Sequence, residues 1–563
     1  MQPLPTVRLG PALLIQGLAL ALILGWWWQR GRTVDLQALA AAAQVLPCVS
    51  YAPFRRPDIN PFNPSAVVTP AQIEEDLTIL KAGTNCIRTY GLGQGLDALP
   101  AVAARLGMRV KLGVWLARDA AQNWRELERG LALARQFKGT VELLIVGNEV
   151  LLRRELLPVE LATYLDHAKR HAPVPVTYAD VWEFWLRHAA LAAHVDVVTA
   201  HILAYWEDDP VAVGDAAAHV HAVAGMLRQR FANQPIWIGE TGWPAAGRQR
   251  AGAVPGRVEQ TRFVRELLVS TARVPLDYNL IEAFDQPWKR AFEGAMGGYW
   301  GLFDQFGQAR VQLTGPVVED LRWWRGLAGA LLGAVLGAVL GAVLGAALGA
   351  VPSTRFGAAS AAALRAAPDA TPRAALLPLT LAGAMLGAII PVQALALQQW
   401  DRTPWEWCTS LLLGTLGAAL TVVVALQLMP TASLPPRVVL RLNRAGALLR
   451  LAVLFCAASM ALVLLADARY RPFPWWWFAA PTASLLAWRA GGLARNRPCS
   501  EEWLLAGILA ACAVAVAIIE GWRNAQALAF CALLIVLAGS IVLGFRAIAS
   551  SASNAAGAHS SAV

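Results

Sequence analysis

The stretch 326–351 contains only glycine, alanine, valine and leucine, and this restricts it to very few structures. The run is long enough to cross the hydrocarbon core of a bilayer, which is about 30 Å thick, as a single helix. Lipid offers no partner for backbone polar groups, so a helix is the structure we expect. Small residues also recur at every fourth position and form a ridge that lets another helix approach closely. The ridge consists of Gly329, Gly333, Gly337, Gly341, Gly345 and Gly349. We expect it to pack within the same chain, and a dimer interface is the alternative.

Other apolar runs in the chain are also typical of membrane helices. They are 11–28, 374–397, 406–429, 446–466, 474–489, 503–519 and 525–545. The run 474–489 is short and contains two prolines. These runs divide the chain into an anchor helix, a soluble domain, a linker, a transmembrane domain of about seven spans and a disordered tail. Their predicted bounds are 1–32, 45–313, 314–325, 326–551 and 552–563.

Arginines between the predicted spans indicate an orientation, because cytoplasmic loops accumulate Lys and Arg. Three alternate loops are rich in arginine: Arg355, Arg365 and Arg373; Arg437, Arg441, Arg444 and Arg450; Arg489, Arg495 and Arg497. The loops between them hold fewer: Arg402; Arg469 and Arg471; Arg523. This alternation requires the run 474–489 to cross. It places residues 29–325 on the non-cytoplasmic side and both termini inside.

The first apolar run could instead be a cleaved signal peptide, since Ala38 and Ala40 form an A-x-A pattern. That pattern lies well beyond the run 11–28, so we expect an uncleaved anchor. Either alternative exports the domain that follows.

The positive charge of the protein belongs to the membrane region. Residues from 326 onward contain about 15 Arg and about 7 acidic residues, counted from the sequence, which leaves a net charge near +2 for the first 325 residues. A nucleic-acid-binding domain would carry the basic charge itself. We therefore expect no nucleic-acid partner.

Between residues 45 and 313, strand-like runs alternate with helical stretches, as in repeated βα units. Eight such units in a domain of this size predict an α/β (β/α)8 TIM barrel. The predicted strands are 45–54, 85–91, 109–116, 141–149, 174–180, 195–206, 234–244 and 278–288.

Two of these strands end in a carboxylate. The stretch LIVGNE ends at Glu149, and IWIGE ends at Glu240. A buried carboxylate is costly unless it is used, and in this fold the carboxyl ends of the strands meet at the active-site mouth. A facing pair of carboxylates suits cleavage of a glycosidic bond.

The segments GNE at 147–149 and GETGWP at 239–244 resemble the motifs of glycoside hydrolase family 17, the β-1,3-glucanases and glucan transglycosylases. The resemblance runs from about Cys48 to Arg310 and is specific because its motifs keep their order and spacing. The further motifs are RTY at 88–90, AYWED at 204–208, FDQPWKR at 284–290 and YWGLF at 299–303. The family implies a TIM barrel, retention of configuration and action on β-linked glucans.

The resemblance assigns the general acid/base to Glu149 and the nucleophile to Glu240. Asn148 could donate to the sugar 2-hydroxyl, and a turn-forming Asn is the alternative. Tyr205 could orient Glu240, although a core tyrosine satisfied elsewhere is nearly as compatible with the sequence. Other residues could line the substrate site or belong to the core: Arg88, Tyr90, His201, Trp206, Trp243, Trp288 and Lys289. Related enzymes often carry an acidic residue where this chain has Gln286.

The histidine and cysteine patterns of the sequence favour neither a metal site nor a disulfide. Seven of the eight histidines lie between 167 and 221, but no accompanying Cys or Glu pattern favours a metal site. We expect solvated side chains for all of them except His201, which lies on the sixth predicted strand and is expected to line the pocket. Cys48 and Cys86 fall on the first two predicted strands, where buried free thiols are expected and a bridge is the alternative. We expect neither a metal nor a cofactor.

The chain is similar to bacterial membrane proteins associated with cyclic or branched β-1,3/β-1,6-glucan synthesis. We therefore predict an inner-membrane β-glucan transglycosylase that faces the periplasm. Its expected partners are a glucan substrate and acceptor, the lipid bilayer and a separate glucan synthase. A tethered endo-β-1,3-glucanase and a catalytically silent glucan-binding or export partner are the alternatives.

Overall fold

A computed structural model describes residues 7–38, 45–56, 59–349, 371–429, 435–466, 470–493 and 498–559. They form two compact units. One unit is Thr33–Glu319, which encloses the predicted range 45–313. The other unit combines Met1–Arg32 with Asp320–Val563.

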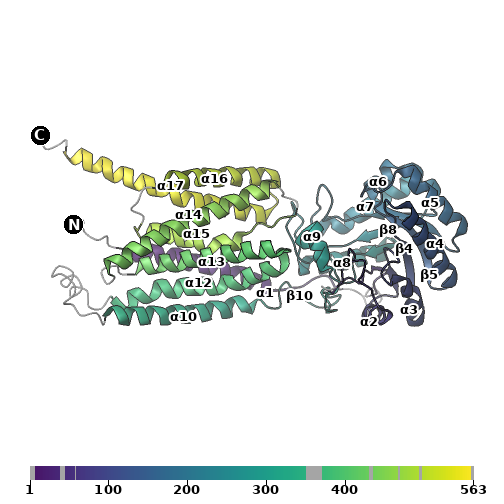
Figure 1. The fold of residues 1–563 in the computed structure, drawn as a ribbon, viewed down its shortest axis with the longest axis horizontal. Coiled ribbons are helices and arrows are strands. Elements are labelled where there is room, and N and C mark those ends of the chain that lie inside the picture. Colours follow the sequence, from purple (N-terminus) through teal and green to yellow (C-terminus); the bar gives the residue numbers. More distant parts are fainter. Residues whose placement is uncertain are drawn as a thin grey trace. The chain divides into compact units, whose positions relative to one another are not determined.

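The unit Thr33–Glu319 is built around a closed barrel of parallel strands in the order β2-β3-β4-β5-β6-β7-β8-β9 (Figure 1). The predicted TIM barrel is therefore confirmed. The strands are β2 (Val49–Ser50), β3 (Cys86–Arg88), β4 (Arg109–Val114), β5 (Val141–Asn148), β6 (Val176–Val181), β7 (Val197–His201), β8 (Ile236–Thr241) and β9 (Tyr278–Leu280). A separate antiparallel pair joins β1 (Thr33–Val34) to β10 (Val317–Val318).

The helices of this unit follow the strands around the barrel. They are α2 (Pro70–Lys81), α3 (Leu99–Leu106), α4 (Ala120–Gln136), α5 (Pro158–His171), α6 (Trp182–Arg187), α7 (Val213–Arg230), α8 (Arg257–Arg273) and α9 (Arg290–Glu293). Side-chain caps fix where several begin. The Thr69 hydroxyl accepts from the backbone N–H of Gln72 at the start of α2, and Asp119 caps α4 in the same way.

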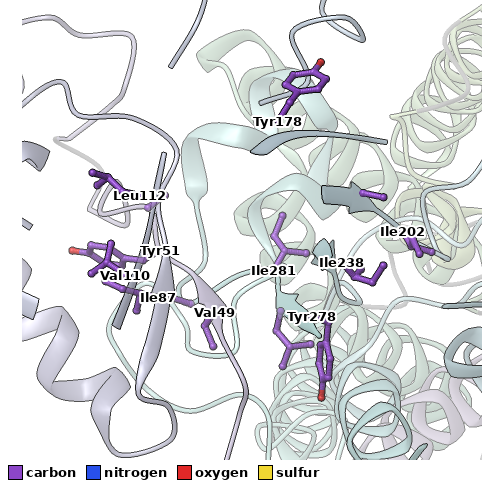
Figure 2. Packing of buried hydrophobic residues seen from close by; sticks show 14 of the residues in the cluster. Val49, Tyr51, Ile87, Val110, Leu112, Tyr178, Ile202, Ile238, Tyr278 and Ile281 are labelled. Carbon is purple, nitrogen blue, oxygen red and sulfur yellow. The ribbon is translucent and has the colours of Figure 1, made fainter. Parts of the chain in front are cut away.

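The apolar core lies between the barrel strands and the surrounding helices. Val49, Ile87 and Val110 pair in register across β2, β3 and β4, and each is 0% exposed (Figure 2). Arg88, which follows Ile87, points the opposite way into the barrel and reaches Glu240 on β8. This packing holds the carboxyl ends of the strands at one rigid edge.

All eight predicted strands are longer than the observed ones, and at β7 the difference changes where two predicted site residues lie. The run 195–206 was expected to be a strand that ends at Tyr205 and Trp206, but β7 ends at His201. The backbone N–H of Trp206 donates to the carbonyl of Leu203, so the chain turns instead of continuing the ladder. Tyr205 and Trp206 therefore belong to the loop after β7.

Cys48 and Cys86 form a disulfide, which corrects the expectation of free thiols. Cys48 lies next to β2, and Cys86 begins β3. These strands are hydrogen-bonded neighbours, so the two cysteines come close in space although 38 positions separate them in the sequence. The bridge ties together the first two strands of the barrel.

The second unit is a bundle of long apolar helices. They are α1 (Leu9–Gly31), α10 (Trp324–Gly349), α12 (Thr371–Trp400), α13 (Pro404–Leu428), α14 (Pro436–Ala466), α15 (Trp475–Ala490), α16 (Ser500–Glu520) and α17 (Ala525–His559). Within the described residues, 7 helices have the length and composition to cross a membrane. They suggest a multi-pass membrane region.

Two predicted segments of this unit differ from the observed helices. The predicted span 474–489 corresponds to α15. With 16 residues, α15 is too short to be counted among the seven helices that could cross a membrane. The predicted disordered tail 552–563 overlaps α17, which continues to His559. Several arginines used to orient the loops lie outside the described residues: Arg355, Arg365, Arg469, Arg495 and Arg497.

The glycine ridge of α10 packs against α12 of the same chain. A Cβ atom added at Gly333 would lie 2.0 Å from the carbonyl oxygen of Gly383, and one added at Gly329 would lie 2.1 Å from that of Gly387. Backbones this close leave no room for a side chain. Larger residues such as Leu331 point away from the contact and are exposed. The ridge therefore contributes to the packing of the bundle itself.

Candidate active site

Glu149 and Glu240 come from strands that lie across the barrel from one another. Glu149 directly follows β5, and Glu240 is the penultimate residue of β8. One carboxylate oxygen of each residue and one ring nitrogen of His201 all lie within 4.8 Å of one another. The structure thus brings together the two carboxylates that the sequence singles out.

The backbone at Glu149 is strained in a way that aims its side chain. Its φ is +52°, in the left-handed region that non-glycine residues rarely adopt. The N–H of Glu149 donates to the carbonyl of Ala179 at 2.7 Å, and the carbonyl of Glu149 accepts from the N–H of Arg153 at 2.8 Å. These bonds hold the turn, and the side chain is partly exposed at the barrel mouth.

Glu240 is held by two donors on the same oxygen. The Arg88 guanidinium donates to its Oε1 at 2.6 Å, and the Tyr90 hydroxyl donates to that atom at 2.8 Å. Both donors come from the end of β3. The side chains of Arg88 and Glu240 are 0% and 6% exposed, so the ion pair is well shielded from water.

Asn148 joins this network through its side-chain oxygen. The guanidinium of Arg88 donates to Asn148 Oδ1, and Nε2 of His201 lies 3.1 Å from the same oxygen. With Oδ1 occupied in this way, the amide Nδ2 is the group that remains to donate elsewhere. His201 is fully buried, and burial lowers its pKa to about 4. The ring is therefore neutral at pH 7.

Glu240 is strongly biased toward its ionised form. Burial alone would raise its pKa, but the charges of His201, Arg88 and Lys289 together with the Tyr90 hydrogen bond lower the pKa to about 2. Because His201 is neutral at pH 7, we assign most of this effect at that pH to Arg88 and Lys289. A permanently ionised carboxylate is suited to nucleophilic attack.

Glu149 is biased in the opposite direction. Burial of its carboxyl group and the negative charges of Glu240 and Asp180 raise its pKa to about 8. The carboxyl group is therefore protonated at neutral pH. Two carboxyl groups whose environments drive their pKa values apart can serve as a base or nucleophile and as an acid.

A second charged group lies beside Glu240. The Lys289 ammonium donates to Oε2 of Glu282 at 2.8 Å, and Glu282 is 0% exposed. Burial raises the pKa of Glu282 to about 7 even though Lys289 opposes this shift. Lys289 was predicted from the sequence, whereas Glu282 was missed. Glu282 follows the apolar run YNLI, the same signal of a carboxylate after a strand that reveals Glu149 and Glu240.

A further missed residue, Asp180, lies beneath the turn that carries Glu149. It accepts a hydrogen bond from the Tyr178 hydroxyl, and its backbone partners include Val181 at 2.8 Å. The Tyr178 oxygen in turn accepts from the N–H of Leu151 at 3.0 Å. Asp180 and Tyr178 therefore fix the chain just after Glu149. Asp180 ends the predicted strand 174–180, so its position was available as a signal.

The predicted aromatic residues separate into two groups. Tyr205 and Trp243 are 0% and 1% exposed and pack against each other. The Tyr205 hydroxyl donates to the carbonyl of Arg248 and is thus satisfied away from Glu240, where Tyr90 makes the expected contact. Trp206 and Trp288 are partly exposed.

Glu149, His201 and Glu240 could also offer three ligand atoms to a metal ion. The donor set fits a cation poorly, because Oε1 of Glu240 already binds the fixed positive charge of Arg88. The neighbouring Lys289 adds a second positive charge. The arrangement suits a sugar bearing a developing positive charge between two carboxylates better than a divalent ion.

Comparison with known proteins agrees with this geometry. Residues 48–301 match the family described as the BtgE/BtgC glycoside hydrolase domain. A glucan 1,3-β-glucosidase of Candida albicans is 25% identical over 252 residues, which cover 41% of this chain and 82% of that protein. A probable glucan endo-1,3-β-glucosidase, btgC, of Aspergillus fumigatus is 26% identical over 299 residues, covering 46% and 42%.

Among solved structures, a family 17 β-1,3-glucanosyltransferase from Rhizomucor miehei is 23% identical, with a TM-score of 0.41. The match covers 48% of this chain and 99% of that one. The family match lies inside the unit Thr33–Glu319. That unit is thus similar to a glycoside hydrolase domain and distantly similar to fungal glucan 1,3-β-glucosidases.

Proposed function

We propose, from the glycoside hydrolase match of residues 48–301, that this chain is a membrane-anchored retaining enzyme that transfers glucosyl segments between β-1,3- or β-1,6-linked glucans. The observation that carries the proposal is the pair Glu149 and Glu240, with ligand atoms within 4.8 Å and pKa values of about 8 and about 2. Carboxyl groups about 5 to 5.5 Å apart are typical of retaining glycosidases, whereas inverting enzymes hold them farther apart to admit a water.

The reaction divides between the two carboxylates. Ionised Glu240 attacks the anomeric carbon and forms a glycosyl-enzyme, while Glu149 gives its proton to the departing glycosidic oxygen. Arg88 and Tyr90 both bind Oε1, and no hydrogen bond of the described barrel goes to Oε2, which is therefore the attacking atom. Glu149, now a carboxylate, then takes a proton from the incoming hydroxyl.

The surrounding residues bind the sugar or support the site. Asn148 donates through its amide to the 2-hydroxyl, a contact that strengthens in the transition state. Lys289 and His201 maintain the charge and shape of the pocket beside Glu240. Trp206 and Trp288 offer ring faces to the substrate. Tyr205 and Trp243 act beneath them as packing, because both are buried.

Transfer and hydrolysis use the same glycosyl-enzyme and differ only in whether a sugar hydroxyl or water attacks it. A multi-pass membrane region favours a remodeller of nascent glucan over a hydrolase that would gain by diffusing away. A tethered endo-β-1,3-glucanase is the second candidate, and the name of the Aspergillus fumigatus relative, a probable glucan endo-1,3-β-glucosidase, favours it. A catalytically silent glucan-binding partner is opposed by the intact carboxylate pair.

We place the barrel on the periplasmic side of a bacterial inner membrane. The Cys48–Cys86 disulfide supports this assignment, because such bridges persist in oxidising compartments. The seven apolar helices and the distribution of arginines between the predicted spans support a multi-pass topology. A separate synthase would supply the glucan, which passes to the barrel as donor and acceptor.

The test is to incubate the detergent-purified protein with reducing-end-labelled β-1,3-gluco-oligosaccharides and to follow chain length by mass spectrometry. We expect products longer than the substrate from the wild type and none from Glu240→Gln. Exclusively shorter products would establish the tethered glucanase. No Glu240-dependent change in any product would refute both enzymatic candidates.

A further inference from the structure

Three aromatic side chains form a cluster on the surface of the barrel unit, which we term the aromatic corner: Phe62, Trp288 and Phe292. The ring centroids of Phe62 and Trp288 are 5.5 Å apart, and those of Phe62 and Phe292 are 5.0 Å apart. Phe62 and Phe292 are 63% and 58% exposed. Grouped exposed aromatics are unusual on a soluble surface and mark a binding site.

The aromatic corner lies on the catalytic edge of the barrel. Phe62 belongs to the loop after β2, while Trp288 and Phe292 belong to the segment after β9. β2 pairs with β9, and β9 pairs with β8, which carries Glu240. All these loops leave the carboxyl ends of parallel strands, so they emerge on the same face as the carboxylate pair.

Electrostatic contacts connect the corner to the reacting groups. Lys289, which follows Trp288, acts on the pKa of Glu240. Glu293, which follows Phe292, acts on the pKa of Glu149. The segment that carries Trp288 and Phe292 therefore lies within electrostatic range of the carboxylate pair.

Hydrogen bonds hold the corner in place. The Trp288 indole donates to Oε1 of Gln286 at 2.9 Å, and Gln286 donates to the carbonyl of Ala52 at 2.8 Å. On the other side, the N–H of Phe62 donates to the side chain of Asn60 at 2.8 Å. The Trp288 ring, fixed in this way, loses little conformational entropy on binding.

We infer that the aromatic corner binds glucose rings of a β-1,3-linked chain beyond the reacting residue, an inference that rests on the proposed function. The C–H faces of a pyranose stack on aromatic rings and remove apolar area from water. The planes of Phe62 and Trp288 meet at 79°, and those of Phe62 and Phe292 at 47°. Such angled faces fit a curved β-1,3 chain and do not provide the flat track that suits an extended β-1,4 chain.

The kinetic test compares long and short substrates. The double variant Phe62→Ser/Phe292→Ser is assayed in detergent with laminaritriose and laminariheptaose. We expect the ratio of kcat/KM for heptaose to that for triose to fall about tenfold, the loss expected for one stacking contact. The control is Val274→Ser, which replaces a residue 55% exposed between α8 and β9, on the opposite edge of the barrel. It should leave the ratio at the wild-type value.

Two outcomes would overturn the inference. An unchanged ratio, or an equal fall for both substrates, would show that the corner does not contact a longer chain. A loss of activity confined to protein reconstituted in phosphatidylethanolamine/phosphatidylglycerol vesicles would instead assign the rings to the bilayer surface.

Calorimetric titration in a Glu240→Gln background separates this inference from the proposed function, because binding requires no turnover. Heptaose binding that depends on Phe62 and Phe292 would support the corner even if the wild type proved inactive. Cellohexaose should bind at least tenfold more weakly than laminarihexaose. Equal binding of the two would contradict the assignment to a β-1,3 chain.

Discussion

At the scale of single residues, the site assigns opposite tasks to two identical side chains. Glu240 is surrounded by cationic groups and hydrogen-bond donors, and Glu149 by burial and negative charge. Neither tendency is a property of glutamate itself. Arg88 connects them, since its guanidinium binds Glu240 and Asn148 together. A change at Arg88 should therefore disturb both the nucleophile and its neighbour.

The two pKa values predict how activity depends on pH. Transfer requires ionised Glu240 and protonated Glu149, so activity should be present between about pH 2 and about pH 8 and should fall above that range as Glu149 loses its proton. The measurement is kcat/KM for laminarin oligosaccharides against pH. An alkaline limit near pH 4 to 5 would contradict a raised pKa at Glu149.

Glu149→Gln provides the matched control for that profile. Loss of the proton donor should lower activity on glucans by about 10²–10⁴-fold. With an aryl glucoside whose leaving group needs no proton, formation of the glycosyl-enzyme should persist, and its alkaline limit should disappear. If the activity of this variant still fell at high pH, the fall would be due to the titration of a group other than Glu149.

Sequence alone predicts the residues that end strands and fails for contacts made across the barrel. Glu149 and Glu240 are evident because each follows an apolar run. The partner of a hydroxyl depends on tertiary position, and therefore the orienting role falls to Tyr90 and not to Tyr205. Glu282 carries the same signal as the catalytic pair, and its ion pair with Lys289 becomes visible only in three dimensions.

At the scale of elements, the hydrophobic periodicity of the sequence predicts whether a segment is a helix or a strand better than it predicts where the segment ends or which strand it pairs with. The alternation of strand and helix predicts the barrel, while β7 ends several residues early because the chain turns at Leu203–Trp206. The Cys48–Cys86 bridge depends on the neighbouring positions of β2 and β3. The spacing of two cysteines in the sequence does not show which strands are neighbours in the barrel.

The glycine ridge of α10 gives a prediction with an internal control. Gly333→Ala should destabilise the bundle, because the new Cβ would lie 2.0 Å from the Gly383 carbonyl oxygen and the helices would have to separate. At Gly345 a Cβ meets no atom within 4 Å, so Gly345→Ala should be neutral or stabilising by up to about 1 kcal/mol from helix propensity. Thermal unfolding in detergent measures both, and equal effects would contradict a close α10–α12 contact.

At the scale of the whole molecule, the chain combines a barrel that carries the candidate active site with a bundle of long apolar helices. The barrel is a single insertion between α1 and α10, so its two connections reach the bundle from the ends of β1 and β10. Trp27 of α1 is 2% exposed, and its indole donates to the carbonyl of Ala388 in α12. The first helix is thus packed as a member of the bundle.

Whether α15 crosses the membrane decides the number of crossings. It also decides the side of the membrane on which the C-terminus lies. Its 16 residues span about 24 Å, less than the hydrocarbon thickness of about 30 Å. However, most of the helix is buried against other helices, including Trp477, Phe478 and Leu485, so its polar ends can be satisfied by protein. We therefore expect α15 to cross, which gives eight spans and a cytoplasmic C-terminus.

The side of the C-terminus can be measured with a C-terminal fluorescent fusion that matures only in the cytoplasm. Protease added to intact spheroplasts then tests whether the barrel is accessible from outside the cell. Fluorescent cells in which external protease cleaves the barrel domain are the expected result, since an even number of spans returns the chain to the side where it began. A dark fusion with an accessible barrel would mean that α15 does not cross. Protection of the barrel would reverse the orientation and would conflict with the Cys48–Cys86 disulfide, which needs an oxidising compartment.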